Sequence, residues 1–228
     1  EYFDYYAFLE RACPNFENNI VWQNVDKRLL IGASGVVSGF ETVFDSLVRP
    51  GMPGALPRNP GKVAGPNYWR QQLPLSLKGV AASGTLPVFR EAEKIDSFCF
   101  WDGLYSNNPP LREFFLPHTQ HPDEIPHTQH PDEIWIVRIN PQEWPDAPKT
   151  NAEIQDRQNE LMGNLSLHKE LDLIFAHRGV TVRTIKMTKS RADNLMYSSK
   201  LNRSRAFMDE MRQEGRDQAQ AWLANWPN

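Results

Sequence analysis

Strand-like and helix-like patterns alternate along the C-terminal part of the chain, and this alternation constrains the fold most strongly. Residues Glu133–Asn140 (EIWIVRIN) combine β-branched and aromatic side chains and end at an Asn-Pro turn, which predicts a buried strand. A helical repeat of apolar residues follows over Glu153–Ala176, then the alternating segment Gly179–Met187, and then a second helical repeat over Leu201–Trp226. Strand, helix, strand and helix in this order predict an α/β fold, in which a layered sheet with a parallel component is flanked by helices.

The first half of the chain adds shorter elements. Tyr2–Leu9 is rich in aromatic residues and predicts a short helix. Two apolar segments separated by Ser-Gly, Arg28–Val37 and Phe40–Phe44, predict a strand–turn–strand hairpin. Residues 49–74 hold six Pro and four Gly in 26 positions, which predicts a long loop without helix or strand. Leu75–Gly84 then predicts a short helix that ends at its glycine.

The composition excludes several classes of protein. The chain has 228 residues, with 25 Lys and Arg against 28 Asp and Glu, so its formal net charge is −3. We expect no nucleic-acid partner, because neutralising phosphates requires a clear surplus of basic residues. No apolar run reaches about 18 residues, which excludes a membrane-spanning helix. The two cysteines, Cys13 and Cys99, are too few for a disulfide scaffold, and no motif calls for a cofactor.

A nine-residue sequence, PHTQHPDEI, occurs twice in tandem over residues 117–134. No solenoid has so short and perfect a period, so we interpret the repeat as an insertion in an exposed surface loop. The repeat carries imidazoles and carboxylates, which are proper zinc ligands. The duplication of one loop sequence, however, accounts for the number of histidines. We therefore predict no functional metal site at His118, His121, His127 and His130.

No serine lies in a nucleophile motif. The Gly-x-Ser-x-Gly elbow needs small neighbours on both sides, because its strand-to-helix turn is strained. Ser34 follows Gly32 but precedes Val36, and Ser83 lacks the preceding glycine. We interpret both as small residues near packed backbone, and the absence of a glycine-rich phosphate loop disfavours a nucleotide enzyme.

The segment Phe98–Pro110 (FCFWDGLYSNNPP) allows two interpretations. In the structural one, Asp102-Gly103 is the two-residue turn of a β-hairpin with apolar arms on either side. In the functional one, the Asp102 carboxylate stands at a strand end between Trp101 and Leu104. Such apolar neighbours would raise its pKa toward the working range of a general base.

Trp101–Pro109 (WDGLYSNNP) resembles the Asp-Gly-Gly/Ala…Asn-x-Pro block of the patatin-like phospholipases, which are lipid acyl hydrolases. Ala81–Phe89 (AASGTLPVF) is similar to that family's Ala-Ser-x-x-x-Pro-x-x-Phe approach to the block, and Leu29–Phe44 to the stretch that precedes it. Pro131–Asn140 and Asp156–Leu171 are similar to the family's C-terminal half. The matching segments follow the family's order.

The resemblance implies a serine–aspartate dyad on an α/β sheet. The serine attacks an ester carbonyl while the aspartate accepts its proton, and water later clears the acyl-enzyme. Only the aspartate is matched here, at Asp102 in the motif Asp102-Gly103-Leu104, where Leu104 replaces the family's small residue. The oxyanion loop and the nucleophile elbow would lie upstream of this chain. We therefore expect an incomplete patatin-like domain over residues 1–228, inactive by itself.

The implied partners are a lipid or ester substrate and a membrane surface. The basic segment 178–216, with ten Lys or Arg against four Asp or Glu, could approach anionic headgroups, or form an ordinary solvated face. We interpret the stripe of Met208, Met211, Trp222 and Trp226 as core. Central strands missing from the sheet would leave an unpaired edge and favour self-association. The alternative to a hydrolase is a noncatalytic α/β interaction module or a degenerate patatin-like protein.

Overall fold

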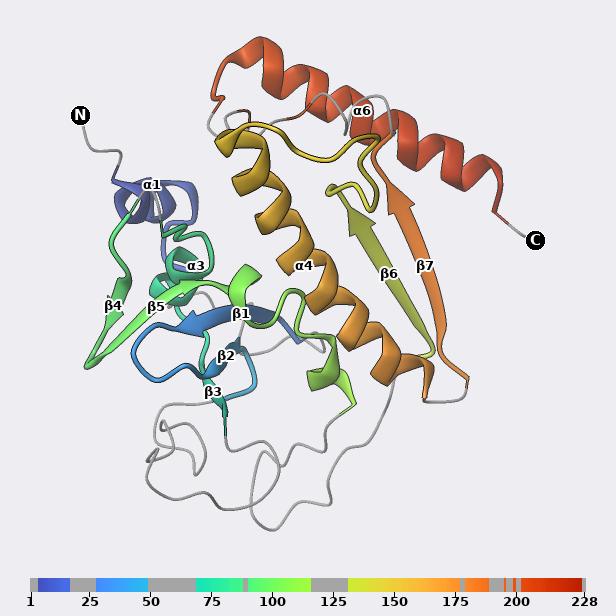
Figure 1. Ribbon diagram of the computed structural model, residues 1–228. Coiled ribbons are helices and arrows are strands. Elements are labelled where there is room, and N and C mark those ends of the chain that lie inside the picture. The colour runs from blue at the N-terminus through green and yellow to red at the C-terminus, as the bar shows by residue number, and fades with distance from the viewer. Residues whose placement is uncertain are drawn as a thin grey trace. The chain divides into compact units, whose positions relative to one another are not determined.

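The structure is a computed structural model with mixed α and β content (Figure 1). It describes residues 4–16, 28–48, 69–87, 90–115, 131–176, 179–188, 195, 199 and 202–226. The α/β fold class predicted from the sequence is confirmed. The chain divides into two compact units: residues 1–129 with 166–174, and residues 130–165 with 175–228.

The first unit contains a five-stranded sheet in the order β3-β2-β1-β5-β4. Strands β1 (Leu30–Gly35) and β2 (Glu41–Asp45) are antiparallel and form the hairpin predicted from the sequence. Gly39 lies in its turn at a φ of +69°, a conformation that glycine adopts at little cost. The hairpin thereby supplies the centre of the sheet, with β3 pairing on one side of it and β5 on the other.

Strand β3 (Arg70–Pro74) corrects the predicted loop over residues 49–74. It pairs in parallel with β2, with Glu41 opposite Arg70 and Asp45 opposite Pro74. The sequence prediction weighed local Pro and Gly content, but the backbone of these five residues is ordered by pairing with a strand far away in the sequence. The rest of that segment, residues 49–68, lies outside the described residues.

Two helices cover part of this sheet. Helix α3 (Leu77–Ser83) begins at Ser76, whose hydroxyl accepts from the Gly79 N–H, and ends at Gly84 as the sequence predicted. At Gly79 a Cβ would come within 2.6 Å of the Phe44 ring, so the absence of a side chain lets helix and sheet approach. Helix α1 (Tyr5–Ala12) packs on α3 through Leu9, beside Leu77 and Ala81. The two helices therefore seal one part of the core.

The remaining elements of this unit are short. Strand β4 (Glu93–Ile95) pairs with β5 (Phe98–Asp102), and two 3₁₀ turns follow, η1 (Gly103–Tyr105) and η2 (Leu111–Phe114). Phe100 is fully buried and meets Phe44 edge to face, with ring centroids 5.6 Å apart. Strands β3 and β4 are the edges of the described sheet. Self-association through an unpaired edge stays a prediction.

The second unit contains a two-stranded parallel sheet. Strand β6 (Glu133–Arg138) lies beside β7 (Thr181–Lys186), and helix α4 (Asn151–Phe175) connects them (Figure 1). The parallel component predicted from the sequence is confirmed. Ile134 and Ile136 are buried, whereas Trp135 and Val137 are 45% and 74% exposed. Strand β6 is therefore buried on one face only, which corrects the prediction of a buried strand.

Helix α6 (Arg205–Ala224) is the long C-terminal helix that the sequence predicted. It begins at Ser204, whose hydroxyl accepts from the Phe207 N–H. None of its side chains is buried, and Met208 is 48% exposed. The interpretation of the Met and Trp stripe as core is therefore confirmed only in part: Trp222 and Trp226 pack on the Trp135 ring, with centroids 4.6 and 4.9 Å from it, but they are only half-buried.

Several predictions fall outside the described residues. Most of the tandem repeat, including its four histidines, is among them. No helix in the described part of the chain combines the length and the hydropathy needed to cross a bilayer.

Candidate active site

Asp102 is the last residue of β5, at the strand end that the functional interpretation requires. Its backbone is held on both sides. Asp102 pairs with Ala33 of the neighbouring strand β1, its N–H donates to the Thr85 carbonyl at 2.9 Å, and its carbonyl accepts from the Ser34 hydroxyl at 2.9 Å. The position of the carboxylate is therefore fixed by pairing along the sheet and by the loop after α3.

Asp102-Gly103 is not a hairpin turn, which corrects the structural interpretation of this segment. The hairpin lies one element earlier, between β4 and β5, and turns at Asp96 and Ser97. Asp96 has a φ of +53°, which Asp tolerates better than most residues. Gly103 instead begins the 3₁₀ turn η1. The sequence pattern was ambiguous because both dipeptides carry turn-forming residues between apolar arms.

Two glycines allow the backbones of β1 and η1 to touch beside Asp102. A Cβ on Gly32 would lie 2.1 Å from the Asn107 carbonyl oxygen, and a Cβ on Gly103 would lie 2.6 Å from the Gly32 carbonyl oxygen. Both contacts are to backbone atoms and cannot be relieved by moving a side chain. The Asp-Gly pairing in the sequence therefore has a steric reason, because only glycine fits after Asp102.

The Asp102 carboxylate is part-buried and caps η1. Its Oδ1 accepts from the Leu104 N–H at 2.8 Å. The Tyr105 phenol is near, since its pKa is raised by burial and, to a smaller extent, by the negative charge of Asp102. The Trp101 and Tyr105 rings lie 6.5 Å apart. The carboxylate thus has one oriented oxygen and an aromatic surrounding.

Neither candidate serine has the surroundings of a nucleophile. Ser34 Oγ lies 2.9 Å from the Asp102 carbonyl oxygen and 2.8 Å from Ser106 Oγ, and Ser106 donates to the Ala33 carbonyl. These partners leave Ser34 without an acid or histidine among the described residues. Ser83 is the last residue of α3, at a helix end instead of a strand-to-helix turn. Both serve as the small polar residues that the sequence analysis expected.

Asn107 is a residue of this site that sequence reasoning missed. It is 1% exposed, its N–H donates to the Gly103 carbonyl at 2.8 Å, and its side-chain amide makes no hydrogen bond with any described residue. A buried amide left in this state costs about 1–3 kcal/mol. The sequence signals were its place in the Asn-Asn-Pro-Pro run, which suggested a turn, and its match to the Asn of the family's Asn-x-Pro motif, and neither predicted its burial.

Metal ligands do not gather at this site. The described residues contain no group of three or more His, Cys, Asp or Glu side chains arranged to hold a metal ion.

Comparisons with known proteins add no assignment. No family model, curated protein or solved structure matches this chain.

Proposed function

We propose that this chain supplies the aspartate of a serine–aspartate dyad in a patatin-like lipid acyl hydrolase, with Asp102 as the proton acceptor. The observation that carries the proposal is the placement of Asp102 at the end of β5, on backbone packed so tightly that only glycine fits at positions 32 and 103. The sequence around it resembles the family's aspartate block. The nucleophilic serine belongs to a segment that this chain does not contain.

The chemistry asks little of Asp102 beyond position and charge. The hydroxyl proton of the serine moves to the carboxylate as its oxygen bonds to the ester carbonyl carbon. The same proton then passes to the departing alcohol, and water hydrolyses the acyl-enzyme by the reverse sequence. The Leu104 N–H on Oδ1 holds the carboxylate plane in one orientation during these transfers. The substrate is a lipid or simple ester, and no cofactor takes part.

A membrane-bound substrate would bring the enzyme to a lipid surface. The basic residues of segment 178–216 that the structure describes include Arg183, Lys186 and Arg205. Arg205 is 96% exposed and pairs with the half-exposed Asp209 at 3.7 Å, a surface pair that solvent and an anionic headgroup can both reach. Peripheral membrane contact is therefore part of the proposal.

The test compares two Asp→Asn substitutions in the polypeptide that carries this chain together with its serine segment. Asp102→Asn keeps the Oδ1 acceptor for Leu104 but removes the base, and we expect p-nitrophenyl butyrate hydrolysis to fall about 100- to 10,000-fold. Asp96→Asn is the control, since it makes the same change at an exposed turn of the same unit. Full activity in the Asp102 variant would remove Asp102 from the mechanism.

A second experiment tests the missing nucleophile. The 228-residue chain is incubated with a serine-reactive fluorophosphonate and analysed by peptide mass spectrometry. We expect no labelled serine. Labelling of Ser34 or Ser83 would contradict the proposal, because a reactive serine would then lie within the chain.

One observation favours the alternative, a noncatalytic interaction module. The Asp102 side chain caps η1, which is a structural role in itself. If this is its whole role, Asp102→Ala lowers the free energy of unfolding by about 0.5–2 kcal/mol, as loss of a cap does, while Asp102→Asn changes neither stability nor activity. The esterase measurement on Asp102→Asn therefore separates the two functions.

A further inference from the structure

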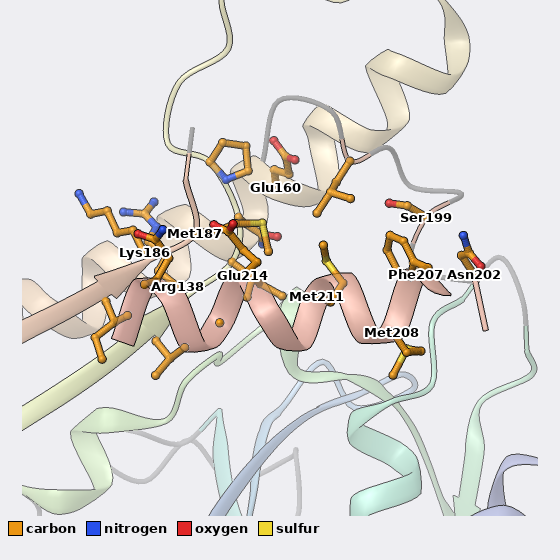
Figure 2. Close-up of a pocket in the computed structure, with 18 of the residues that line it drawn as sticks. Arg138, Glu160, Lys186, Met187, Ser199, Asn202, Phe207, Met208, Met211 and Glu214 are labelled. Atoms are coloured by element: carbon orange, nitrogen blue, oxygen red, sulfur yellow. The ribbon is translucent and has the colours of Figure 1, made fainter. Parts of the chain in front are cut away.

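A cavity of about 410 Å³ lies in the second unit, between the C-terminal ends of β6 and β7 and helix α6 (Figure 2). Its walls are mainly apolar. The apolar side chains that carry the argument come from the sheet side and from α6, and they are Val137, Ile139, Ile185, Met187, Phe207 and Met211. Ligand sites in proteins have this size and composition, with a few polar groups that fix the orientation of the ligand.

The cavity lies where α6 does not close onto the sheet, whereas farther along the helix Trp222 and Trp226 pack on Trp135 of β6. On the sheet side, Val137 and Ile139 are 74% and 63% exposed. On the helix side, Phe207 and Met211 line the cavity, but no side chain of α6 is buried. Two apolar surfaces therefore face a common space without filling it. An apolar ligand in this space would remove both surfaces from water, which is favourable.

Three charged residues stand at one end of the cavity, whereas Arg203, which also lines it, follows Asn202 at the other end (Figure 2). Figure 2 places Arg138, Lys186 and Glu214 around the strand ends, and Phe207 farther along the helix, beyond Met211. A ligand with a charged group at the strand ends and an apolar chain between the sheet and α6 would match the lining there. The sign of the polar end follows from which of the protein's charges already have partners.

The two glutamates of the cavity are already bonded. Glu160 accepts from the Trp144 indole at 2.6 Å and from Arg157 at 3.2 Å. Burial also raises the pKa of Glu160, which makes its charged form less favourable there. Glu214 accepts from the Thr188 N–H at 2.8 Å. Glu160 therefore has its cation in Arg157, whereas Glu214 has a hydrogen-bond donor but no ion pair within the described part of the chain.

The cations are less well satisfied. Arg138 donates through Nη2 to Asn164 at 2.7 Å and to Gln142, but its buried Nε makes no hydrogen bond with a described residue. Burial lowers the pKa of Arg138, with no carboxylate offsetting the loss of solvent. Lys186 forms no ion pair within the part of the chain that the structure describes. At the strand ends, the two cations Arg138 and Lys186 stand against the single carboxylate of Glu214, so the net charge there is positive and suits an anionic group.

The volume of the cavity limits the length of the ligand's apolar chain. At about 30 Å³ for each water-sized group, the cavity of 410 Å³ holds about thirteen such groups. We propose that it binds a straight-chain fatty acid of about ten carbons, with its carboxylate at Arg138 and Lys186 and its alkyl chain between the sheet and α6. Every lining residue belongs to the second unit, so the site does not depend on the role of Asp102.

Calorimetric titration with sodium decanoate, below the concentration at which it forms micelles, tests the proposal. We expect one saturable site per chain, with affinity falling roughly fourfold for each methylene removed in octanoate and hexanoate. Decylamine has the same chain with a cation and should bind more weakly than decanoate. Absence of saturable decanoate binding, or tighter binding of decylamine, would overturn the proposal.

A substitution at Gly215 locates the site. Gly215 lines the cavity one helical turn after Met211, and a Cβ there meets no atom within 4 Å. Gly215→Leu should therefore fill the space and abolish decanoate binding, while helix propensity keeps α6 folded. Gly215→Ala is the matched control and should retain binding. Equal binding by the wild type and the leucine variant would place the ligand elsewhere and contradict the assignment.

The contact between the ligand's carboxylate and Lys186 is tested by Lys186→Gln. The control is Lys149→Gln, which makes the same change of charge at an exposed residue that does not line the cavity. We expect weaker decanoate binding only in the Lys186 variant. Identical affinities in the two variants would show that the carboxylate does not lie at this end.

Discussion

Both units of this chain bury some charged side chains and expose some apolar ones, and the charged residues of the first unit and the apolar residues of the second show this most clearly. In the first unit, Asp45, Arg70 and Glu113 are almost completely buried. In the second, Val137, Ile139 and Leu223 are more than half exposed. Hydrophobicity therefore does not decide burial residue by residue in this protein. What decides it is whether a neighbouring element offers each side chain a partner.

Partners are what make the buried charges of the first unit tolerable. Arg70 pairs with Glu113 and, at 3.1 Å, with Glu41, while Arg28 pairs with Asp45 at 2.5 Å. Arg28 also donates to the Glu113 carbonyl at 2.6 Å, so the two pairs are linked. Arg138 and Lys186, at the cavity of the second unit, form no ion pair with a carboxylate of the described residues. The comparison separates a network that specifies structure from charges left available to a ligand.

The largest expected effect tests the network. Arg70→Met leaves Glu113 and Glu41 without their cation, and we expect the free energy of unfolding to fall by roughly 3–5 kcal/mol. Urea denaturation followed by circular dichroism measures it. The control is Arg205→Met, at a residue 96% exposed, which should change stability by no more than about 0.5 kcal/mol. A loss as small in the Arg70 variant would show that the network contributes no specificity.

A smaller effect is expected where the first unit packs backbone on backbone. Gly32→Ala would place a methyl group 2.1 Å from the Asn107 carbonyl oxygen, and we expect a destabilisation of about 1–3 kcal/mol. Hydrogen exchange should be faster in η1, next to the contact. Unchanged exchange and stability would mean that β1 and η1 separate without cost.

The opposite sign is expected at the glycine of the second unit. Gly215 lies inside α6 in open space, so Gly215→Ala should stabilise by about 0.8–1.0 kcal/mol through helix propensity alone. Slower hydrogen exchange of the α6 amides measures it. A destabilised alanine variant would show that the second unit is packed as tightly here as the first, which would remove the contrast between them.

The smallest effect concerns pH. Burial raises the pKa of Glu113, because loss of solvent outweighs the opposing charge of Arg70 and the hydrogen bond from Gln72. The folded state then holds this proton more tightly than the unfolded state. Its contribution to stability is full below the ordinary carboxyl pKa of 4.5 and is lost as the pH rises through the raised pKa.

Glu113→Gln cannot titrate and so lacks this loss. We expect the free energy of unfolding of the variant, relative to the wild type, to increase between pH 4 and pH 8, as measured by urea denaturation. Glu41, whose pKa burial also raises, titrates in both proteins and largely cancels in the difference. A difference that decreases with pH would show that the attraction of Arg70 dominates over burial.

Much of the fold could be predicted because its signals are local. The hairpin of β1 and β2, the end of α3 at Gly84 and the alternation of β6, α4, β7 and α6 all follow from periodicity, caps and turn residues. These signals act through hydrogen bonds and contacts within a few residues along the chain. The candidate aspartate could also be placed at a strand end from its neighbours in sequence.

The sequence by itself therefore determined where most helices and strands form, and which carboxylate ends β5. Only the tertiary structure decided that Arg70–Pro74 is a strand, that Asp102-Gly103 begins a 3₁₀ turn, and that α6 leaves a cavity above its sheet. The physical reason is the same in each case. Strand pairing, close backbone approach and burial depend on partners distant in the sequence, and no local pattern contains them.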